Sequence, residues 1–249
     1  MTPPLASHDR PSSTKQSRLS NVLRRLLMRR ATIVAADWLA EGFRLVTLEG
    51  QALRGVVWTP GQKVQVAVGT ALATRTYTPI DWDPEQGRTR ILCFAHGDGP
   101  GSAWVRGVGA GDGCDILGPR ASLDAGHGTG ALGVFGDETS IGLAYALAQQ
   151  DPARSISSYF EIGNKASAEH VRTALQIRNV TLFLRSEGDA HLAQMEAALS
   201  PVLNAGAAFV LTGKASTVQR LRHELKRRGV PANRVVTKAY WAPGKTGMD

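Results

Sequence analysis

The segment Arg75-Thr-Tyr-Thr-Pro79 places an arginine, a tyrosine, two threonines and a proline in five consecutive positions. The forked donors of Arg75 match phosphate oxygens, Tyr77 offers a flat face to a ring system, and the Thr78 hydroxyl can bond a ring nitrogen. On a strand Arg75 and Tyr77 share one face, and Pro79 restricts the backbone that follows. These residues are compatible with a flavin nucleotide, with phosphate at Arg75 and rings at Tyr77. The same pattern also occurs on solvated edge strands.

A glycine-rich stretch, His-Gly-Asp-Gly-Pro-Gly-Ser-Ala-Trp, runs from His96 to Trp104. Its glycines let the backbone approach a ligand closely, and Ser102 with the neighbouring amides can meet phosphate oxygens. If a helix begins at Ser102, its N-terminal amides favour a pyrophosphate. The alternative is a turn without a ligand, in which His96 holds the loop instead of acting as a base.

The stretch Gly136-Asp-Glu-Thr-Ser140 closes a buried apolar run and opens a helical pattern. Asp137, Glu138 and Thr139 are therefore expected at the ligand-binding edge of a parallel sheet. The stretch lacks the Gly-x-Gly-x-x-Gly fingerprint, so it does not by itself indicate a dinucleotide. Adjacent acids point apart and commonly cap a helix, and no nucleophile–base–acid set for hydrolysis is recognisable.

The rhythm of apolar residues divides the chain into two halves. Between residues 31 and 126, six short runs separated by Gly and Pro predict strands of a closed antiparallel barrel: 32–35, 43–48, 63–68, 75–78, 89–94 and 114–118. After residue 126, four buried strand patterns alternate with helical ones, which predicts a Rossmann-like parallel α/β domain. Its predicted strands are 131–135, 157–162, 180–184 and 207–212, and its helices 141–150, 166–175, 191–199 and 217–228. The expected fold is a six-stranded β-barrel domain (29–127) followed by an α/β domain (128–249), with the boundary near 126–130.

Composition narrows the class of protein. A length of 249 residues is enough for two domains, and 43% hydrophobic with 20% charged residues is typical of a soluble globular chain. No apolar run of about 18 residues predicts a transmembrane segment. Two isolated cysteines, Cys93 and Cys114, exclude an iron–sulfur or disulfide framework and indicate a reducing compartment, here the cytoplasm.

The net charge of +8 is unevenly distributed, because residues 1–30 hold seven basic side chains and one acid. The rest of the chain is nearly balanced and has no nucleic-acid reading motif, so a nucleic-acid partner is not expected. Residues 1–28 are predicted to be an extension, with a disordered tail over 1–18 and an arginine-rich helix after it. That helix either docks on the body or belongs to a targeting presequence.

Six motifs, taken in order, resemble the siderophore-interacting protein family, flavin-dependent ferric-siderophore reductases of the ferredoxin-reductase-like superfamily. The resemblance covers residues 30–245 and is carried by Arg75-Thr-Tyr-Thr-Pro79, His96 to Trp104, Gly118-Pro-Arg-Ala-Ser122, Gly136-Asp-Glu-Thr139, Val180-Thr-Leu-Phe-Leu-Arg185 and Ala239-Tyr-Trp241. It implies an FAD-binding barrel followed by a domain for NADH or NADPH.

The resemblance also implies roles for individual side chains. The residues expected to bind cofactor are Arg75, Tyr77, Thr78, Pro79, His96, Gly101, Ser102, Trp104, Asp137, Thr139 and Trp241. The residues expected to attract an anionic ferric siderophore are Lys63, Arg120 and Lys238, of which Lys238 is only near its motif position.

Three positions depart from the family pattern, and all lie in the nucleotide half. Lys214 stands where a glutamate is usual, residues 140–142 lack a proline, and Ala242 replaces an arginine. The hydride donor is therefore open. Glu161 at a strand end favours NADH through a ribose hydroxyl, whereas a nearby cation such as Lys165, Arg178 or Arg185 favours the 2′-phosphate of NADPH.

The expected activity is electron transfer from NAD(P)H through FAD to siderophore-bound Fe(III), which releases Fe(II). Because the chelator holds the iron, the protein needs no metal ligands of its own, and it is expected to act as a monomer. Two alternatives remain at this point. One is a flavin reductase that feeds a partner redox protein, and the other is a siderophore binder with a degenerate nucleotide site.

Overall fold

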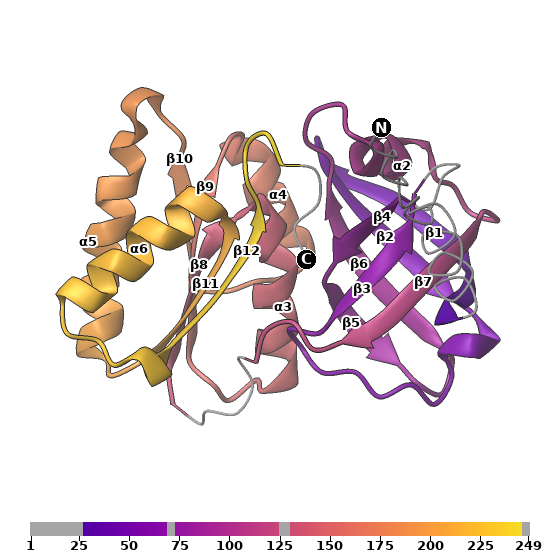
Figure 1. The fold of residues 1–249 in the computed structure, drawn as a ribbon, viewed down its shortest axis with the longest axis horizontal. Helices are drawn as coiled ribbons and strands as arrows, with labels where there is room; N and C mark the ends of the chain where they lie inside the picture. The colour runs from indigo at the N-terminus through magenta and orange to yellow at the C-terminus, as the bar shows by residue number, and fades with distance from the viewer. Residues whose placement is uncertain (1–26, 69–72, 125–129, 246–249) are drawn as a thin grey trace, which may run out of the picture.

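The computed structural model of this protein describes residues 27–68, 73–124 and 130–245. Figure 1 shows a strand-rich N-terminal half beside a C-terminal half in which helices flank a second sheet. The predicted tail and most of the predicted arginine-rich helix lie outside the described residues, as does most of the predicted domain boundary. In the described chain, the last strand of the first sheet ends at Arg120, and the first strand of the second sheet begins at Leu132.

The first sheet contains seven described strands, and every pairing within it is antiparallel. The strands are β1 (Arg29–Ala40), β2 (Phe43–Glu49), β3 (Lys63–Ala67), β4 (Thr74–Tyr77), β5 (Pro79–Asp83), β6 (Arg88–Phe94) and β7 (Gly113–Arg120), in the order β4-β3-β7-β1-β2-β6-β5. The 3-10 turn η1 (Gln51–Leu53) follows β2, and helix α2 (Pro100–Gly107) follows β6.

The barrel prediction needs two corrections. All six predicted strands are present, but β5 is an additional one. Among the described strands, β4 and β5 are the two edges of the sheet and do not pair with each other, so the ladder of hydrogen bonds does not close. In the chain, Thr78 alone joins these two strands. Pro79 is the first residue of the edge strand β5, so its missing N–H costs the sheet no hydrogen bond. Aspartate is depleted in strands and β5 contains two, yet Ile80 is buried in it and the Arg90 guanidinium donates to Asp81.

Side chains that alternate along the strands build the barrel core. Val46 and Leu48 of β2 and Ile91 and Cys93 of β6 are fully buried, whereas the residues between them are more exposed. This period of two follows from the pleat of a strand and sends every second side chain inward.

The second sheet is parallel, in the order β10-β9-β8-β11-β12. Its strands are β8 (Leu132–Asp137), β9 (Ile156–Ile162), β10 (Val180–Leu184), β11 (Ala208–Lys214) and β12 (Val235–Trp241). Its helices are α3 (Ile141–Gln150), α4 (Lys165–Ala174), α5 (Ala190–Asn204) and α6 (Ala215–Arg227). The short 3-10 turns are η2 (Glu138–Ser140), η3 (Glu187–Asp189) and η4 (Ala232–Arg234). The four predicted strands and four predicted helices are all present, and β12 is an edge strand that the sequence patterns did not predict.

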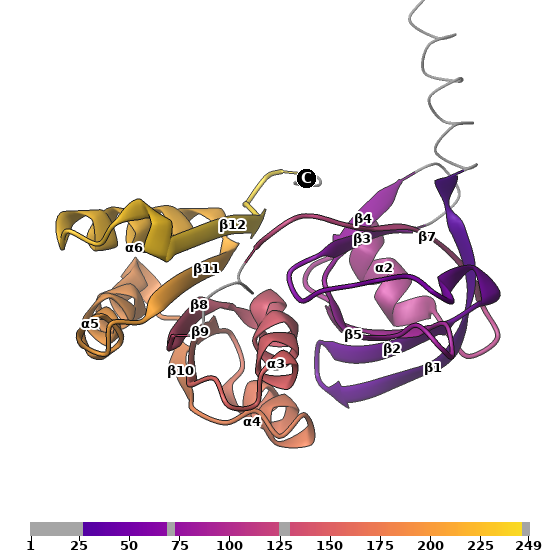
Figure 2. The same ribbon diagram turned by 90° about the horizontal axis from the view of Figure 1, so that it is seen from below.

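The helices cover both faces of the parallel sheet, as expected for a doubly wound domain. In Figure 2, α3 and α4 lie on the face turned toward the first sheet, and α5 and α6 lie on the opposite face. The strand order reverses between β8 and β11, so the carboxyl end of β8, at Asp137, lies at the switch point where such sheets bind ligands.

Helix α3 joins the two halves by packing against β5 and β6. A Cβ on Gly142 would lie 2.9 Å from Ile80 Cγ2 and 3.4 Å from Leu92 Cβ, so the helix approaches the barrel as closely as a glycine allows. The Asn164 amide also donates to the Glu41 carboxylate at 3.3 Å. These contacts hold the carboxyl end of the parallel sheet near α2 and β4.

Candidate functional site

A cavity of about 420 Å³ lies between the two halves and has the size of a typical ligand site. We call it the central cavity. It is lined by residues of β3, β4, β6, α2, η2, α3 and β12, by Thr78 between β4 and β5, and by residues of the segments that follow β6, β7 and β12. Ten of the fourteen predicted site residues line it: Lys63, Arg75, Tyr77, Thr78, His96, Gly101, Ser102, Thr139, Lys238 and Trp241.

The other four predicted site residues lie outside the lining. Pro79 is buried at the start of β5, and Trp104 packs behind Tyr77 with ring centroids 5.7 Å apart. Asp137 is fully buried behind Trp241. Arg120 is exposed on β7 opposite Lys63, and its guanidinium donates to Gln65 Oε1 at 2.5 Å. Trp104 and Asp137 therefore contact lining residues from behind. Pro79 directly follows the lining residue Thr78, and Arg120 pairs with Lys63 across the sheet.

Arg75 and Gly101 form one wall of the central cavity. The Arg75 guanidinium donates to the Thr74 carbonyl at 2.8 Å and makes no other hydrogen bond or ion pair within the described chain, which leaves donors for an anion. A Cβ on Gly101 would lie 3.1 Å from Arg75 Cγ and 3.4 Å from the Tyr77 hydroxyl. The missing side chain therefore keeps the wall open beside both residues, as a cradle for a phosphate and a ring requires.

Helix α2 begins at Pro100, two residues before the start considered from the sequence. Proline suits this first helical position because no intrahelical partner exists there for its missing N–H. The Ser102 hydroxyl donates to the His96 carbonyl at 2.7 Å and thereby anchors the glycine-rich loop. The backbone amides of the first turn, more than this hydroxyl, are the groups that could meet phosphate oxygens.

A stack of rings crosses from the barrel to the last strand. His96 lies between Phe94, at 5.9 Å, and Trp241, at 5.4 Å between ring centroids. Burial lowers the pKa of His96, so its imidazole is neutral at neutral pH. The Trp241 indole N–H donates to Asp137 Oδ2 at 2.7 Å, which joins this stack to the end of β8.

Asp137 organises the switch point through its hydrogen bonds. Its carboxylate accepts from the Thr139 backbone N–H at 2.9 Å and from the Thr139 hydroxyl, and so caps η2. A Cβ on Gly213 would come within 2.6 Å of this carboxylate, so β11 can pass Asp137 only with a glycine there. Burial raises the pKa of Asp137 to about 6 against the lowering effect of these bonds. Asp137 therefore supports the site from behind.

Several lining residues were missed from the sequence. Tyr240 lies beside Trp241 and is hydrogen-bonded to the Thr78 and Thr212 side chains, and burial raises its pKa to about 12. Ser122 also lines the cavity, and both residues belong to motifs that were recognised without assigning them a role. Lys245 lines the cavity because a turn closed by its N–H on the Ala242 carbonyl at 3.2 Å brings the chain back. No sequence signal marked Lys245.

The central cavity is basic. Lys63, Arg75, Lys238 and Lys245 line it together with His96, and none of the described lining residues is an aspartate or glutamate. A low-dielectric wall with charges of one sign concentrates the field and attracts anions. The chemistry of the lining therefore suits a phosphate-bearing cofactor and an anionic second ligand.

Comparisons with known proteins identify the family of this chain. Residues 14–123 match the Siderophore-interacting FAD-binding domain, and residues 131–244 match the Siderophore-interacting protein domain. The chain belongs to the siderophore-interacting protein family. It therefore contains an FAD-binding domain, and its fold is that of the ferredoxin reductases. No curated protein sequence matches it.

Solved structures of siderophore-interacting proteins share the fold of this chain at low sequence identity. The siderophore-interacting protein from Acinetobacter baumannii has a TM-score of 0.73 at 18% identity over 88% of this chain and 92% of that one. SipS from Aeromonas hydrophila has a TM-score of 0.71 at 20% identity over 88% and 93%. Phthalate dioxygenase reductase has a TM-score of 0.72 at 14% identity over 88% and 70%.

In this family member, Glu161 is not available to a ribose hydroxyl. Glu161 is 0% exposed. Its Oε1 accepts from Thr217 Oγ1 at 2.6 Å, and its Oε2 lies 3.0 Å from His191 Nε2. The expectation that Glu161 selects NADH by binding the ribose is therefore wrong. The strand end lies where it was predicted, but buried polar partners already satisfy the carboxylate.

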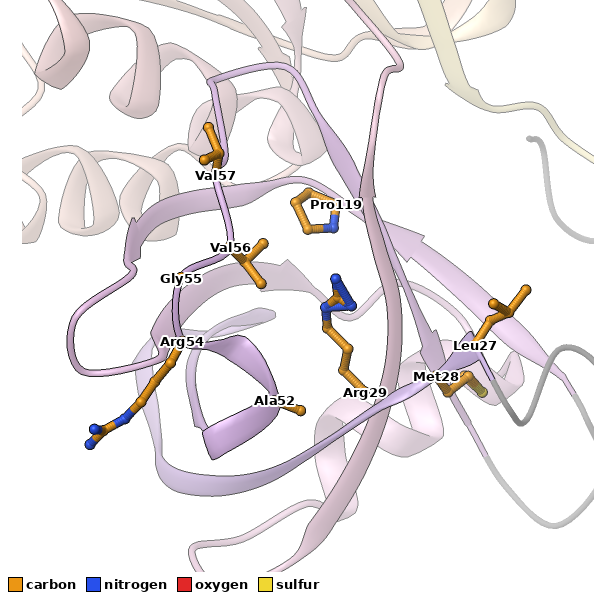
Figure 3. A pocket seen from close by; sticks show the side chains of 9 residues that line it. All are labelled: Leu27, Met28, Arg29, Ala52, Arg54, Gly55, Val56, Val57 and Pro119. Atoms are coloured by element: carbon orange, nitrogen blue, oxygen red, sulfur yellow. The ribbon is translucent and has the colours of Figure 1, made fainter.

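A second hollow, of about 680 Å³, opens at the end of the barrel and is more exposed than the central cavity. Figure 3 shows the Arg29 guanidinium pointing between Val56 and Pro119, with Leu27 at the rim. This barrel-end hollow shares no described residue with the central cavity and contains none of the predicted site residues. The predicted site residues that line a cavity therefore all line the central cavity, although it is the smaller of the two.

Two further features bear on function. Within the described ranges, no group of three or more His, Cys, Asp or Glu side chains is arranged to hold a metal ion. The described helices are all too short or too polar to cross a bilayer.

Proposed function

We propose that this protein reduces ferric siderophores with electrons from NAD(P)H that pass through FAD. One observation carries the proposal: a single cavity combines the Arg75–Tyr77–Gly101 wall with three lysines and has no described acid in its lining. The wall suits the phosphate and the rings of FAD, and the lysines suit an anionic chelate beside them.

The residues present meet the needs of FAD. Arg75 offers guanidinium donors at the wall, the first turn of α2 offers backbone amides, and Gly101 leaves room beside both. Tyr77 offers its ring face, and Trp104 supports that ring from behind. Burial raises the pKa of Tyr77 far above neutrality, so its hydroxyl stays protonated and can donate a hydrogen bond. Thr78 is held by Tyr240 at the polar rim.

FAD held by Arg75, Tyr77 and the first turn of α2 would supply the chemistry that links a two-electron hydride donor, NAD(P)H, to a one-electron acceptor. Oxidising one NAD(P)H therefore reduces two ferric ions and releases one proton to solvent. Lys63 and Lys238 hold the anionic chelate by charge, and the neutral His96 beside the rings adds no competing anion site. The hard oxygen donors of a siderophore bind Fe(II) less tightly than Fe(III), so the reduced ion leaves.

The experiment that tests this function follows flavin colour and ferrous iron. Purified protein loaded with FAD is mixed anaerobically with NADH or NADPH, and a ferric siderophore and a ferrous-iron trap are then added. We expect the flavin absorbance to bleach, return on addition of the chelate, and yield trapped Fe(II). Arg75→Ala with Tyr77→Ala should lose FAD, whereas the control Arg222→Ala on α6 should keep it. Stoichiometric FAD in the double variant would contradict the site assignment.

The same assay separates the two alternatives. A flavin reductase for a partner protein bleaches with NAD(P)H but shows no preference for a ferric chelate. A siderophore binder with a degenerate nucleotide site binds the chelate and does not bleach. Action as a monomer, a cytoplasmic location and the lack of a nucleic-acid partner stay predictions.

A further inference from the structure

A buried ionic network closes the carboxyl ends of β8, β9 and β10. Glu138, directly after β8, accepts from Arg185 Nη1 at 2.8 Å and from Arg185 Nη2 at 2.6 Å. Its Oε1 also accepts from the Gly163 backbone N–H at 2.7 Å. The Glu138 side chain is only 4% exposed, so this carboxylate is held by a guanidinium fork and an amide with little access to water.

Glu161 belongs to the same network. Its Oε2 lies 3.6 Å from Arg185 Nε and 3.0 Å from His191 Nε2. The Ser186 backbone N–H donates to His191 Nδ1 at 3.3 Å, so Nε2 carries the imidazole hydrogen and donates to Glu161. One guanidinium thus faces two buried carboxylates.

The position of the network is the one at which doubly wound sheets distinguish NADH from NADPH. At the end of the second strand, an acid that bonds the ribose 2′-hydroxyl favours NADH, and a nearby arginine accommodates the 2′-phosphate of NADPH. Here the second strand is β9, and Arg185 Nη2 donates to the Glu161 backbone carbonyl at 3.2 Å. The acid and the arginine are both present at this end, but each is already bound within the network.

We propose that Glu138 is an internal anion that occupies Arg185 and makes this edge of the sheet select NADH over NADPH. The proposal rests on the proposed function only in taking a pyridine nucleotide as the electron donor. The Arg185 side chain is 29% exposed, but Glu138 accepts from both of its Nη atoms. A 2′-phosphate could therefore pair with both ends of this fork only by displacing Glu138. The displaced carboxylate would stay buried beside Glu161 and Asp137 without its partner, which is costly. A 2′-hydroxyl requires no such exchange.

Direct binding tests the proposal without any turnover. Adenosine 2′,5′-bisphosphate and 5′-AMP differ only in the 2′-phosphate, and calorimetry measures the affinity of the FAD-loaded protein for each. We expect the wild-type protein to bind the bisphosphate no more tightly than 5′-AMP. In Glu138→Gln the amide oxygen still accepts from Gly163, but the fork is released. The ratio of the affinity for the bisphosphate to the affinity for 5′-AMP should then rise about tenfold.

Two further variants assign the effect to Arg185. Adding Arg185→Gln to Glu138→Gln should remove the gain, because the freed cation is then gone. Glu169→Gln breaks an exposed Glu–Arg pair on α4, 2.6 Å long, and should leave the affinity ratio at the wild-type value. Thermal unfolding of each variant separates a change in selectivity from a loss of folded protein.

Three outcomes would overturn the proposal. The first is that the wild-type protein binds the bisphosphate several-fold more tightly than 5′-AMP. The second is that Glu138→Gln leaves the affinity ratio unchanged. The third is that neither ligand binds the wild-type protein or Glu138→Gln. A protein that shows the expected ratio but no flavin bleaching would instead refute the proposed reductase function alone.

Discussion

The Trp241 indole N–H donates a 2.7 Å hydrogen bond to the buried carboxylate of Asp137, so the end of β12 is fastened to the end of β8. The same indole lies 5.4 Å from the His96 ring of the barrel half. One side chain therefore touches both halves at the wall of the central cavity. This contact couples the switch point of the parallel sheet to the predicted FAD site.

Asp137 should make the stability of the protein depend on pH between about 4 and 7. Burial raises the pKa of Asp137 to about 6, above its unfolded value, so the native state binds this proton more tightly. The stabilising contribution is present below the unfolded pKa and is lost as pH rises through 6. We compare the unfolding free energies of the wild type and of Asp137→Asn. We expect the value for the wild type minus the value for the variant to fall by about 1–3 kcal/mol as the pH rises from 4 to 7. Urea denaturation of both proteins measures it, and parallel pH curves would refute the prediction.

A methyl group at Gly101 should weaken FAD binding while leaving the fold intact. The added Cβ would lie 3.1 Å from Arg75 Cγ and displace the side chain assigned to the phosphate. We expect Gly101→Ala to raise the dissociation constant for FAD about threefold to tenfold in a fluorescence titration. The control is Gly107→Ala at the other end of α2, where an added Cβ meets nothing within 4 Å. Equal affinities for the two variants would contradict the assignment of this wall.

The lysines at the central cavity should control the use of anionic chelates. Removing the positive charge of Lys238 or Lys245 weakens the attraction of a negatively charged ferric chelate. We expect Lys238→Gln and Lys245→Gln each to raise KM about twofold to fivefold at low salt, with a smaller effect at high salt. A neutral chelate should show no change, and Lys226→Gln on α6 is the control. Identical effects on charged and neutral chelates would point to a structural role.

Gly142 should be needed for the packing of α3 against the barrel. The extra atoms of Gly142→Val would overlap Ile80 and Leu92, because even a Cβ would lie 2.9 Å from Ile80 Cγ2. We expect a loss of about 1–3 kcal/mol in unfolding free energy, as overpacked cores show. Gln149→Val places the same side chain on an exposed position of the same helix and controls for the helix propensity of valine. A loss of equal size in both variants would refute close packing at Gly142.

Local patterns were sufficient to predict most elements. The parallel strands β8, β9 and β11 are buried on both faces and therefore appear as apolar runs, and the helices repeat their apolar residues with the helical period. The patterns failed at β5 and β12. Both are edge strands, and β12 is half-buried along its whole length, so neither carries a clear alternation. Hydrogen bonds to the neighbouring strand, which depend on the rest of the fold, make them strands.

By itself the sequence determined the two-part architecture and the motifs that carry the family chemistry, because apolar periodicity and short motifs are local properties of the chain. Only the tertiary structure decided that Lys245 returns to the central cavity, that Trp241 bonds Asp137 across 104 positions, and that Arg185 is already paired with Glu138. Such contacts depend on which strand ends meet at one edge of a sheet. Whether a charged residue is free to bind a ligand or is already neutralised is therefore settled by burial and by partners distant in the chain.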